Sequence, residues 1–337
     1  MLQLRVEAIK PETADTSTFY LKEVSGKRVI YKAGQFITLV IIHHGEEIRR
    51  SYSLSSSPDE DLLAVTIKRV PNGEITRYLH TYAKVGDVWN TVPPAGRFTV
   101  PEHTNQRELF YFAAGGGIPP IYAHIKYLLR HQPQVNITLF YSNIKPKSII
   151  FKQQLEELAA SHPQQLTVVH LLSSDARRLN NVMVEKLVRQ YAKRDILQAG
   201  YYLCGPFTYM RMVKLTLLYM GINATHIHQE NFVLETVPVT ETTHTFPPQT
   251  LRIHYQNQWH DITAGENQTI LQAALQNQLH IPYSCGSGVC AACAVKCTSG
   301  KVTIVKNEVL TDDELKQGWV LTCTGYAIND NVALDFG

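Results

Sequence analysis

The chain has 337 residues, more than one hydrophobic core usually holds, so we expect two or three domains. Hydrophobic residues make up 44% of the chain and charged residues 18%, with 32 basic and 29 acidic side chains and a net charge of +3. This even balance, without a long run of one sign, gives no reason to expect a nucleic acid or an anionic membrane as partner.

The first hundred residues are predicted to form mostly strands. Residues 1–7 alternate as a strand does and lack the apolar core of a signal peptide. Residues 36–40 and 63–67 also alternate, turn residues separate the segments, and only 75–83 has a helical pattern. We therefore expect an antiparallel β-barrel domain over residues 1–102. Because no apolar run is long enough to cross a bilayer, we also expect a cytoplasmic protein without a membrane span.

The segment Arg50-Ser51-Tyr52-Ser53 in this domain has the residue types that a flavin site needs. In an extended segment Arg50 and Tyr52 project to one face and Ser53 to the other. An arginine suits a bidentate grip on a phosphate, and a tyrosine ring can stack on an isoalloxazine. Taken alone, a basic edge strand with a half-buried tyrosine explains the segment equally well.

Further motifs follow in an order that resembles the ferredoxin–NADP reductase family, whose flavin signature R-x-Y-S matches residues 50–53. Residues 73–76 resemble the family's G-x-x-S/T, which opens a helix whose N–H groups bind the flavin pyrophosphate. Residues 66–69 lie where the family's strand passes the flavin, and 94–98 resemble the loop that closes the barrel. The resemblance implies flavin-binding roles for Arg50, Ser51, Tyr52, Ser53, Ile67, Lys68, Gly73, Glu74, Ile75 and Thr76.

From about residue 108 to 234 strands alternate with helices, which predicts a doubly wound, Rossmann-like α/β domain over 103–235. Residues 109–114 are a continuous apolar run, as in a buried parallel strand, and 122–130 have a helical pattern. The run between them, Gly-Gly-Gly-Ile-Pro-Pro at 115–120, resembles the family's G-x-G-x-x-P. Its glycines let a dinucleotide approach the backbone, and the helix N-terminus favours the pyrophosphate.

Three later segments of this domain also resemble the family's nicotinamide site. Cys204-Gly205-Pro206 with Met210 resembles C-G-P-x-x-x-M, whose cysteine packs beside the nicotinamide ring; a buried structural thiol is the alternative. Residues 230–232 resemble E-x-F near the flavin, and 142–143 lie where relatives bind the adenosine ribose. The implied cofactor-binding residues are Gly115, Gly116, Gly117, Ile118, Pro120, Ser142, Asn143, Cys204, Gly205, Pro206, Met210 and Phe232, and the implied catalytic residues are Ser53, Cys204 and Glu230. Whether NADH or NADPH is the electron donor stays open.

Residues 236–249 are rich in Thr and Pro, have no period and are predicted to be a linker before a domain over 250–337. In that domain Thr311 starts a capping box that predicts a short helix. Five of the six cysteines lie between Cys285 and Cys323, which favours a metal site in a reducing compartment over a secreted disulfide framework.

Four of these cysteines, Cys285, Cys290, Cys293 and Cys323, have the spacing C-x4-C-x2-C followed by a distant C, which is typical of a plant-type [2Fe–2S] cluster. Zinc, the alternative, usually takes two short ligand pairs, and this chain has one. Residues 282–294 resemble the cluster loop of plant-type ferredoxins, which implies an α+β, β-grasp fold here.

The order of flavin barrel, nicotinamide domain, linker and ferredoxin resembles the reductase components of oxygenases, that of phenylacetyl-CoA epoxidase among them. Phthalate dioxygenase reductase shares the order but uses FMN, and the nearer resemblance to the first group implies FAD. We expect a monomer that passes electrons from NAD(P)H through FAD to a [2Fe–2S] cluster and on to a protein such as an oxygenase. A redox-sensing module and a self-sufficient NAD(P)H oxidase or ferric reductase are the alternatives. The terminal acceptor stays open.

Overall fold

The computed structural model describes residues 1–70, 73–102, 105–175, 178–232 and 245–336. These residues fall into two compact units, Met1–Val233 and Leu234–Gly337. Most of the expected linker, up to residue 244, lies outside the described residues. No helix among the described residues is long and apolar enough to span a membrane.

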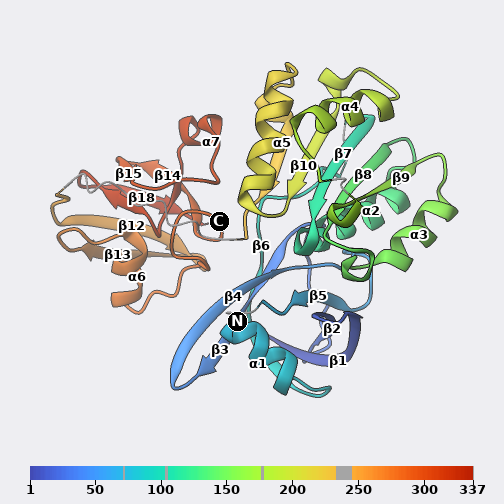
Figure 1. Cartoon of the computed structure of the whole chain (residues 1–337). Coiled ribbons are helices and arrows are strands. Elements are labelled where there is room, and N and C mark those ends of the chain that lie inside the picture. Colours follow the sequence, from blue (N-terminus) through green and yellow to red (C-terminus); the bar gives the residue numbers. More distant parts are fainter. Residues whose placement is uncertain (71–72, 103–104, 176–177, 233–244, 337) are drawn as a thin grey trace. The chain divides into compact units, whose positions relative to one another are not determined.

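Six antiparallel strands form the first sheet, in the order β4-β3-β6-β1-β2-β5 (Figure 1). An isolated bridge between Leu54, just after β4, and Val65 in β5 brings the two edge strands together, so the sheet closes as the expected barrel. Helix α1 spans Glu74–Tyr82, close to the predicted range 75–83, and its Ile75 and Leu79 side chains are buried in the core. The strands are β1 (Leu2–Thr13), β2 (Thr16–Glu23), β3 (Phe36–His43), β4 (Glu46–Ser53), β5 (Leu63–Lys68) and β6 (Val88–Ala95).

Five parallel strands form the second sheet, in the order β11-β10-β7-β8-β9, with helices on both faces (Figure 1). Along β7, Leu109 and Tyr111 share one core with α2 and α3, whereas Phe110 and Phe112 share the other with α4 and α5. The strands are β7 (Glu108–Ala114), β8 (Asn136–Asn143), β9 (Leu166–Leu172), β10 (Gly200–Cys204) and β11 (Ile227–Glu230), and the helices are α2 (Ile118–His131), α3 (Lys152–Ser161), α4 (Asn181–Tyr191) and α5 (Phe207–Tyr219). Short 3-10 helices lie at Gly115–Gly117, Pro146–Ser148, Ser173–Asp175, Ile196–Gln198 and Ala224–His226.

The strand order reverses at β7, since the chain runs from β7 to β8 and β9 on one side and returns to β10 and β11 on the other. Ligands of such sheets bind beyond the carboxyl ends of the strands at this reversal. Helix α2 begins there at Ile118, earlier than the predicted 122, because Pro119 and Pro120 occupy its first turn, where no N–H group is needed.

Helix α2 also joins the second sheet to the barrel. His124 is fully buried, and its Nε2 lies 3.1 Å from the carbonyl oxygen of Ala33 and 3.0 Å from that of Phe98. Burial lowers the pKa of His124 to about 3, so the neutral ring donates one N–H toward two barrel carbonyls. Lys126 forms an ion pair with Glu60 at the rim of this contact. The barrel and the second sheet therefore form one compact unit.

The C-terminal unit has a five-stranded sheet in the order β13-β12-β18-β14-β16 and a separate pair, β15 and β17. Helix α6 buries Ile270 and Ala273 in its core. The predicted capping box is confirmed, because Thr311 accepts from the Glu314 N–H group and α7 follows. The strands are β12 (Gln249–Tyr255), β13 (Gln258–Ala264), β14 (Ala294–Ser299), β15 (Val302–Ile304), β16 (Trp319–Leu321), β17 (Gly325–Ala327) and β18 (Val332–Asp335), and the helices are α6 (Ile270–Gln276) and α7 (Asp312–Lys316).

Candidate functional site

The four cysteines of the C-terminal unit meet although Cys323 is far from the others in sequence. Cys293 Sγ lies 3.2 Å from Cys323 Sγ. The Cys285 thiol also contacts those of Cys290 and Cys323, so the four thiols form one connected group. Cys293 and Cys323 are buried, while Cys285 and Cys290 keep partial exposure.

The loop that carries the first three cysteines directs backbone N–H groups at the sulfurs. The Ser287 N–H group donates to Cys285 Sγ over 3.4 Å, and the Gly288 N–H group donates to Cys323 Sγ over 3.3 Å. Gly288 has a φ of +79°, and a Cβ there would lie 2.4 Å from the carbonyl oxygen of Lys306. Only glycine fits this position without strain, and the N–H groups stabilise negative charge on the sulfurs.

The spread of the sulfurs distinguishes two irons from one zinc ion. Four thiolates around one zinc, with bonds of about 2.3 Å, lie about 3.8 Å from one another. Within the described part of the chain, the one group of three metal-binding atoms that all lie within 4.8 Å of one another is His43, His44 and Glu74. Among the described residues, no three cysteine sulfurs are this close to one another, so they do not form the compact tetrahedron of a single four-thiolate zinc site.

The barrel places Tyr52 and Ser53 at the end of β4. Both hydroxyl oxygens are buried and have no hydrogen-bond partner among the described residues. Burial raises the pKa of Tyr52 to about 12, so the hydroxyl keeps its proton. Leaving buried polar groups unpaired costs about 1–3 kcal/mol each, which a polar ligand would recover. Arg50, on the same strand, is exposed and donates to the adjacent Arg49 carbonyl oxygen over 2.8 Å.

The turn before α1 lies beside a basic hollow. Thr76 Oγ1 donates to the Gly73 carbonyl oxygen over 3.0 Å, so this hydroxyl closes the turn. The first N–H groups of a helix have no partner within it and are available to a ligand. A hollow of about 420 Å³ next to the turn is lined by Asp15, Lys68, Arg69, Val70 and Arg77. Three cations against one carboxylate suit a diphosphate.

The sequence had indicated only Lys68 in this hollow as a binding residue. Arg77 could have been found from its place one helical turn after Gly73. Asp15 could not, because it comes from the turn between β1 and β2, and its carboxylate reaches within 3.5 Å of Lys68 Nζ only in the folded barrel.

The glycine turn after β7 touches the end of β10. A Cβ on Gly117 would lie 2.2 Å from the Cys204 carbonyl oxygen, so this glycine permits close contact between the two strands' ends. A Cβ on Gly115 would meet no described atom within 4 Å. A Cβ on Gly116 would lie 3.9 Å from Lys68 Cδ, which is its nearest described neighbour. The turn is therefore open on the side facing the basic hollow, where a dinucleotide can reach the backbone.

Cys204 and Glu230 are register partners at the ends of β10 and β11. Burial raises the pKa of Glu230 to about 8, and burial together with Glu230 raises that of the Cys204 thiol well above its ordinary value. At neutral pH both groups are therefore mostly protonated. Gly205 and Pro206 follow Cys204 and lead into α5, whose Met210 is buried in the core between α5 and the sheet.

A buried amide, Asn143, and a half-buried one, Asn231, lie at the carboxyl ends of the strands. Asn143 Nδ2, at the end of β8, and Asn231 Oδ1, just after β11, have no hydrogen-bond partner within the described part of the chain. Ser142 Oγ donates to the Tyr209 hydroxyl over 3.4 Å, whereas Phe232 is 47% exposed. Asn231 was not expected from the sequence, because only the fold reveals its buried and unpaired oxygen.

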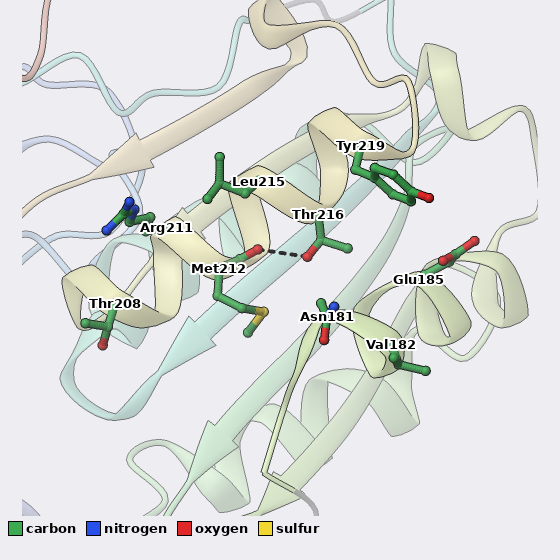
Figure 2. Close-up of a pocket in the computed structure, with 9 residues that line it drawn as sticks. All are labelled: Asn181, Val182, Glu185, Thr208, Arg211, Met212, Leu215, Thr216 and Tyr219. Atoms are coloured by element: carbon green, nitrogen blue, oxygen red, sulfur yellow. Dashed lines mark hydrogen bonds between the residues drawn. The ribbon is translucent and has the colours of Figure 1, made fainter.

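A separate hollow of about 540 Å³ lies between α4 and α5 (Figure 2). Leu215, Tyr219 and Val182 line it and are exposed, and Thr216 Oγ1 donates to the Met212 carbonyl oxygen over 2.8 Å. None of the expected site residues is among the described residues that line this hollow.

Three family models match the chain in sequence order. An oxidoreductase FAD-binding domain matches residues 3–100, an oxidoreductase NAD-binding domain matches 112–215, and a 2Fe-2S iron-sulfur cluster binding domain matches 253–327. The three cofactors expected from the sequence, FAD, a nicotinamide dinucleotide and a [2Fe–2S] cluster, are thus confirmed.

Relatives match this chain over nearly its whole length. The ferredoxin reductase component of 3-ketosteroid-9-alpha-monooxygenase from Mycobacterium tuberculosis is 31% identical over 100% of this chain and 96% of its own length. A component of 1,2-phenylacetyl-CoA epoxidase from Escherichia coli is 28% identical over 99% of this chain and 97% of its own. The crystal structure of phthalate dioxygenase reductase superposes with a TM-score of 0.62 at 21% identity, covering 99% of this chain and 97% of that one, which shows a shared fold.

Proposed function

Since this chain belongs to the family of oxygenase reductase components that join FAD-binding, NAD-binding and [2Fe–2S] domains in one polypeptide, we propose which of its residues perform each step. The protein is a reductase component that transfers electrons from NAD(P)H through FAD and a [2Fe–2S] cluster to an oxygenase. The observation that carries this conclusion is the convergence of four thiols, with N–H donors, downstream of complete flavin and nicotinamide domains.

A bound FAD would supply the conversion between the two-electron chemistry of NAD(P)H and the one-electron chemistry of the cluster. We propose that Arg50 and the basic hollow hold its phosphates, because Arg50 is exposed and the hollow has an excess of cations over carboxylates. Ser53 is proposed to supply its hydroxyl group to the polar edge of the flavin, and its unpaired oxygen supports this role. Tyr52, which projects to the other face of the strand, is proposed to offer its ring for stacking on the isoalloxazine.

The nicotinamide dinucleotide is proposed to bind across the open glycine turn and the ends of β8, β10 and β11. Cys204 and the protonated Glu230 present an uncharged surface there, because burial raises both pKa values. Asn143 offers an unpaired N–H group at the end of β8 and Asn231 an unpaired oxygen just after β11. Because β7 and β10 lie between these strands, the two amides are proposed to contact different parts of the dinucleotide.

The four cysteines differ in exposure. Cys285 and Cys290 are partly exposed, whereas Cys293 and Cys323 are buried, so the first pair would hold the more accessible side of a bound cluster. An electron acceptor would approach on that side. We propose a monomer located in the cytoplasm, divided into domains 1–102, 103–235 and 250–337, and the three family matches support this division. The linker expected at 236–249 ends earlier than expected, because Gln249 begins β12 and the Phe246 N–H group already donates to Asn267 Oδ1.

The partner is proposed to be an oxygenase whose substrate this chain does not determine. The relatives are components of a 3-ketosteroid-9-alpha-monooxygenase (31% identity), a glycine betaine monooxygenase (28%) and a 1,2-phenylacetyl-CoA epoxidase (28%). Similar reductases thus serve dissimilar substrates, as expected when the reductase contacts only the oxygenase protein.

The experiment compares Cys293→Ser with Cys297→Ser. Cys297 has its own contact, with the Ser299 carbonyl oxygen at 3.2 Å, and is not part of the cluster, so its variant is a matched control. Cys293→Ser should keep NAD(P)H-to-dye activity and lose cytochrome c reduction, while Cys297→Ser keeps both. Loss of dye activity at full flavin content, or retained cytochrome c reduction after iron loss, would contradict the proposed electron order.

A further inference from the structure

Two histidines and a glutamate converge at the tip of the β3–β4 hairpin, beside the start of α1. His43 ends β3, His44 lies in the turn, and Glu74 is the first residue of α1. His43 Nε2 lies 3.0 Å from Glu74 Oε1, and His44 Nε2 lies 3.9 Å from the same oxygen. One ligand atom from each residue lies within 4.8 Å of the other two.

These distances match a tetrahedral metal site. Metal–nitrogen and metal–oxygen bonds of about 2.0–2.2 Å place neighbouring ligand atoms about 3.4 Å apart. The two nitrogen–oxygen separations, 3.0 Å and 3.9 Å, lie on either side of that value. The His43 side chain is only 15% exposed and its ring lies 5.0 Å from that of Tyr78, whereas the His44 side chain is 80% exposed. His43 is therefore already positioned, and His44 is free to adjust.

The His44 ring lies edge-on to the His43 ring, with the ring centroids 4.2 Å apart, but neither this contact nor the ion pair between His43 and Glu74 requires His44 Nε2 to lie near the Glu74 carboxylate. His44 has a φ of +51° and Gly45 one of +82°, as in a two-residue type I′ hairpin turn, where Asn or Gly is usual at the first position. At 3.9 Å from Glu74 Oε1, His44 Nε2 is too far for a hydrogen bond. A shared ion accounts for both the direction of the ring and the remaining gap.

The donor set indicates which ions suit the site. Imidazole nitrogens favour zinc, copper and nickel over magnesium and calcium, which prefer oxygen ligands alone. Two histidines and one glutamate leave a fourth position for water on zinc. We propose that His43, His44 and Glu74 bind a divalent transition-metal ion, with Zn²⁺ the best match, and that the ion fastens the hairpin tip to the first turn of α1.

The test measures zinc and iron per chain after equilibrium dialysis of the untagged, cluster-loaded protein against buffered Zn²⁺. The wild type should take up about one zinc per chain and keep its iron. His44→Gln and His43→Gln should bind zinc about 100-fold more weakly or worse, since even residues that only support a ligand affect affinity by about 10–100-fold. Zinc should also raise the thermal unfolding midpoint of the wild type but not of His44→Gln, because an ion that binds only the folded state stabilises it.

His131→Gln is the matched control, because His131 faces one carboxylate, Asp59, at 3.6 Å and belongs to no group of three ligands among the described residues. It should bind zinc as the wild type does. The proposal is overturned if the wild type takes up no zinc. It is also overturned if His44→Gln takes up as much zinc as the wild type, whether or not the protein loses iron at the same time. Because His44 is exposed in a turn, its variant should fold and keep NAD(P)H-to-dye activity.

Discussion

Replacing Gly288 by alanine should expel the cluster while leaving the flavin unit intact. The φ of Gly288 is +79°, and the left-handed region costs an alanine about 1–2 kcal/mol. The added Cβ would also lie 2.4 Å from the Lys306 carbonyl oxygen, and relief of such crowding costs about 1–3 kcal/mol more. The backbone shift would also disturb the Gly288 N–H bond to Cys323 Sγ. We therefore expect a total cost of about 2–5 kcal/mol.

Gly286→Ala, in the same loop, separates backbone strain from crowding. Gly286 has a φ of +66°, but a Cβ there would meet no described atom within 4 Å, so only the conformational cost remains. The assay follows the visible absorbance of the cluster and the release of iron to a chelator over time. Gly288→Ala should lose its cluster at least about fivefold faster than Gly286→Ala, since the additional crowding costs about 1–3 kcal/mol and about 1.4 kcal/mol corresponds to a factor of ten. Equal rates of loss, or a wild-type rate in Gly288→Ala, would refute the reasoning.

Two further predictions concern the first unit. Arg50→Ala should lower the FAD content that remains after gel filtration. The control is Arg28→Ala, which removes another exposed arginine, bonded to the Pro58 carbonyl oxygen, and should keep its FAD. Equal FAD retention in the two variants would count against a contact between Arg50 and a phosphate. Because burial raises the pKa of Glu230 from 4.5 to about 8, its ionisation opposes folding, and the fold loses stability as pH rises through this window. The advantage of Glu230→Gln over the wild type should therefore increase by about 3 kcal/mol from about pH 6 to pH 8, at about 1.4 kcal/mol per pH unit. Thermal unfolding at both pH values measures this gain, Glu185→Gln on the surface of α4 is the control, and a gain that does not vary with pH would contradict the assignment.

Features that depend on short stretches of sequence were predictable. Alternation and apolar runs indicated the barrel and the parallel sheet, and the capping box at Thr311 indicated α7. Three of the cluster cysteines lie in one loop, so their spacing alone pointed to the iron–sulfur chemistry that the domain match confirms. The start of α2 was predicted wrongly, because prolines at 119 and 120 do not show the helical pattern although they occupy the first turn of the helix.

Features that join distant segments were decided only by the tertiary structure. The Gly288 N–H bond to Cys323, the pairing of Cys204 with Glu230 and the meeting of His43 with Glu74 each require a particular strand order and register. The raised pKa of Glu230 likewise depends on how completely the fold removes water from its carboxyl group. Residue type and spacing determine which chemical groups are available, whereas burial and proximity arise from the packing of elements that are far apart along the chain. For this reason the sequence by itself identified the cofactors of this protein, and the fold determined how its residues can meet them.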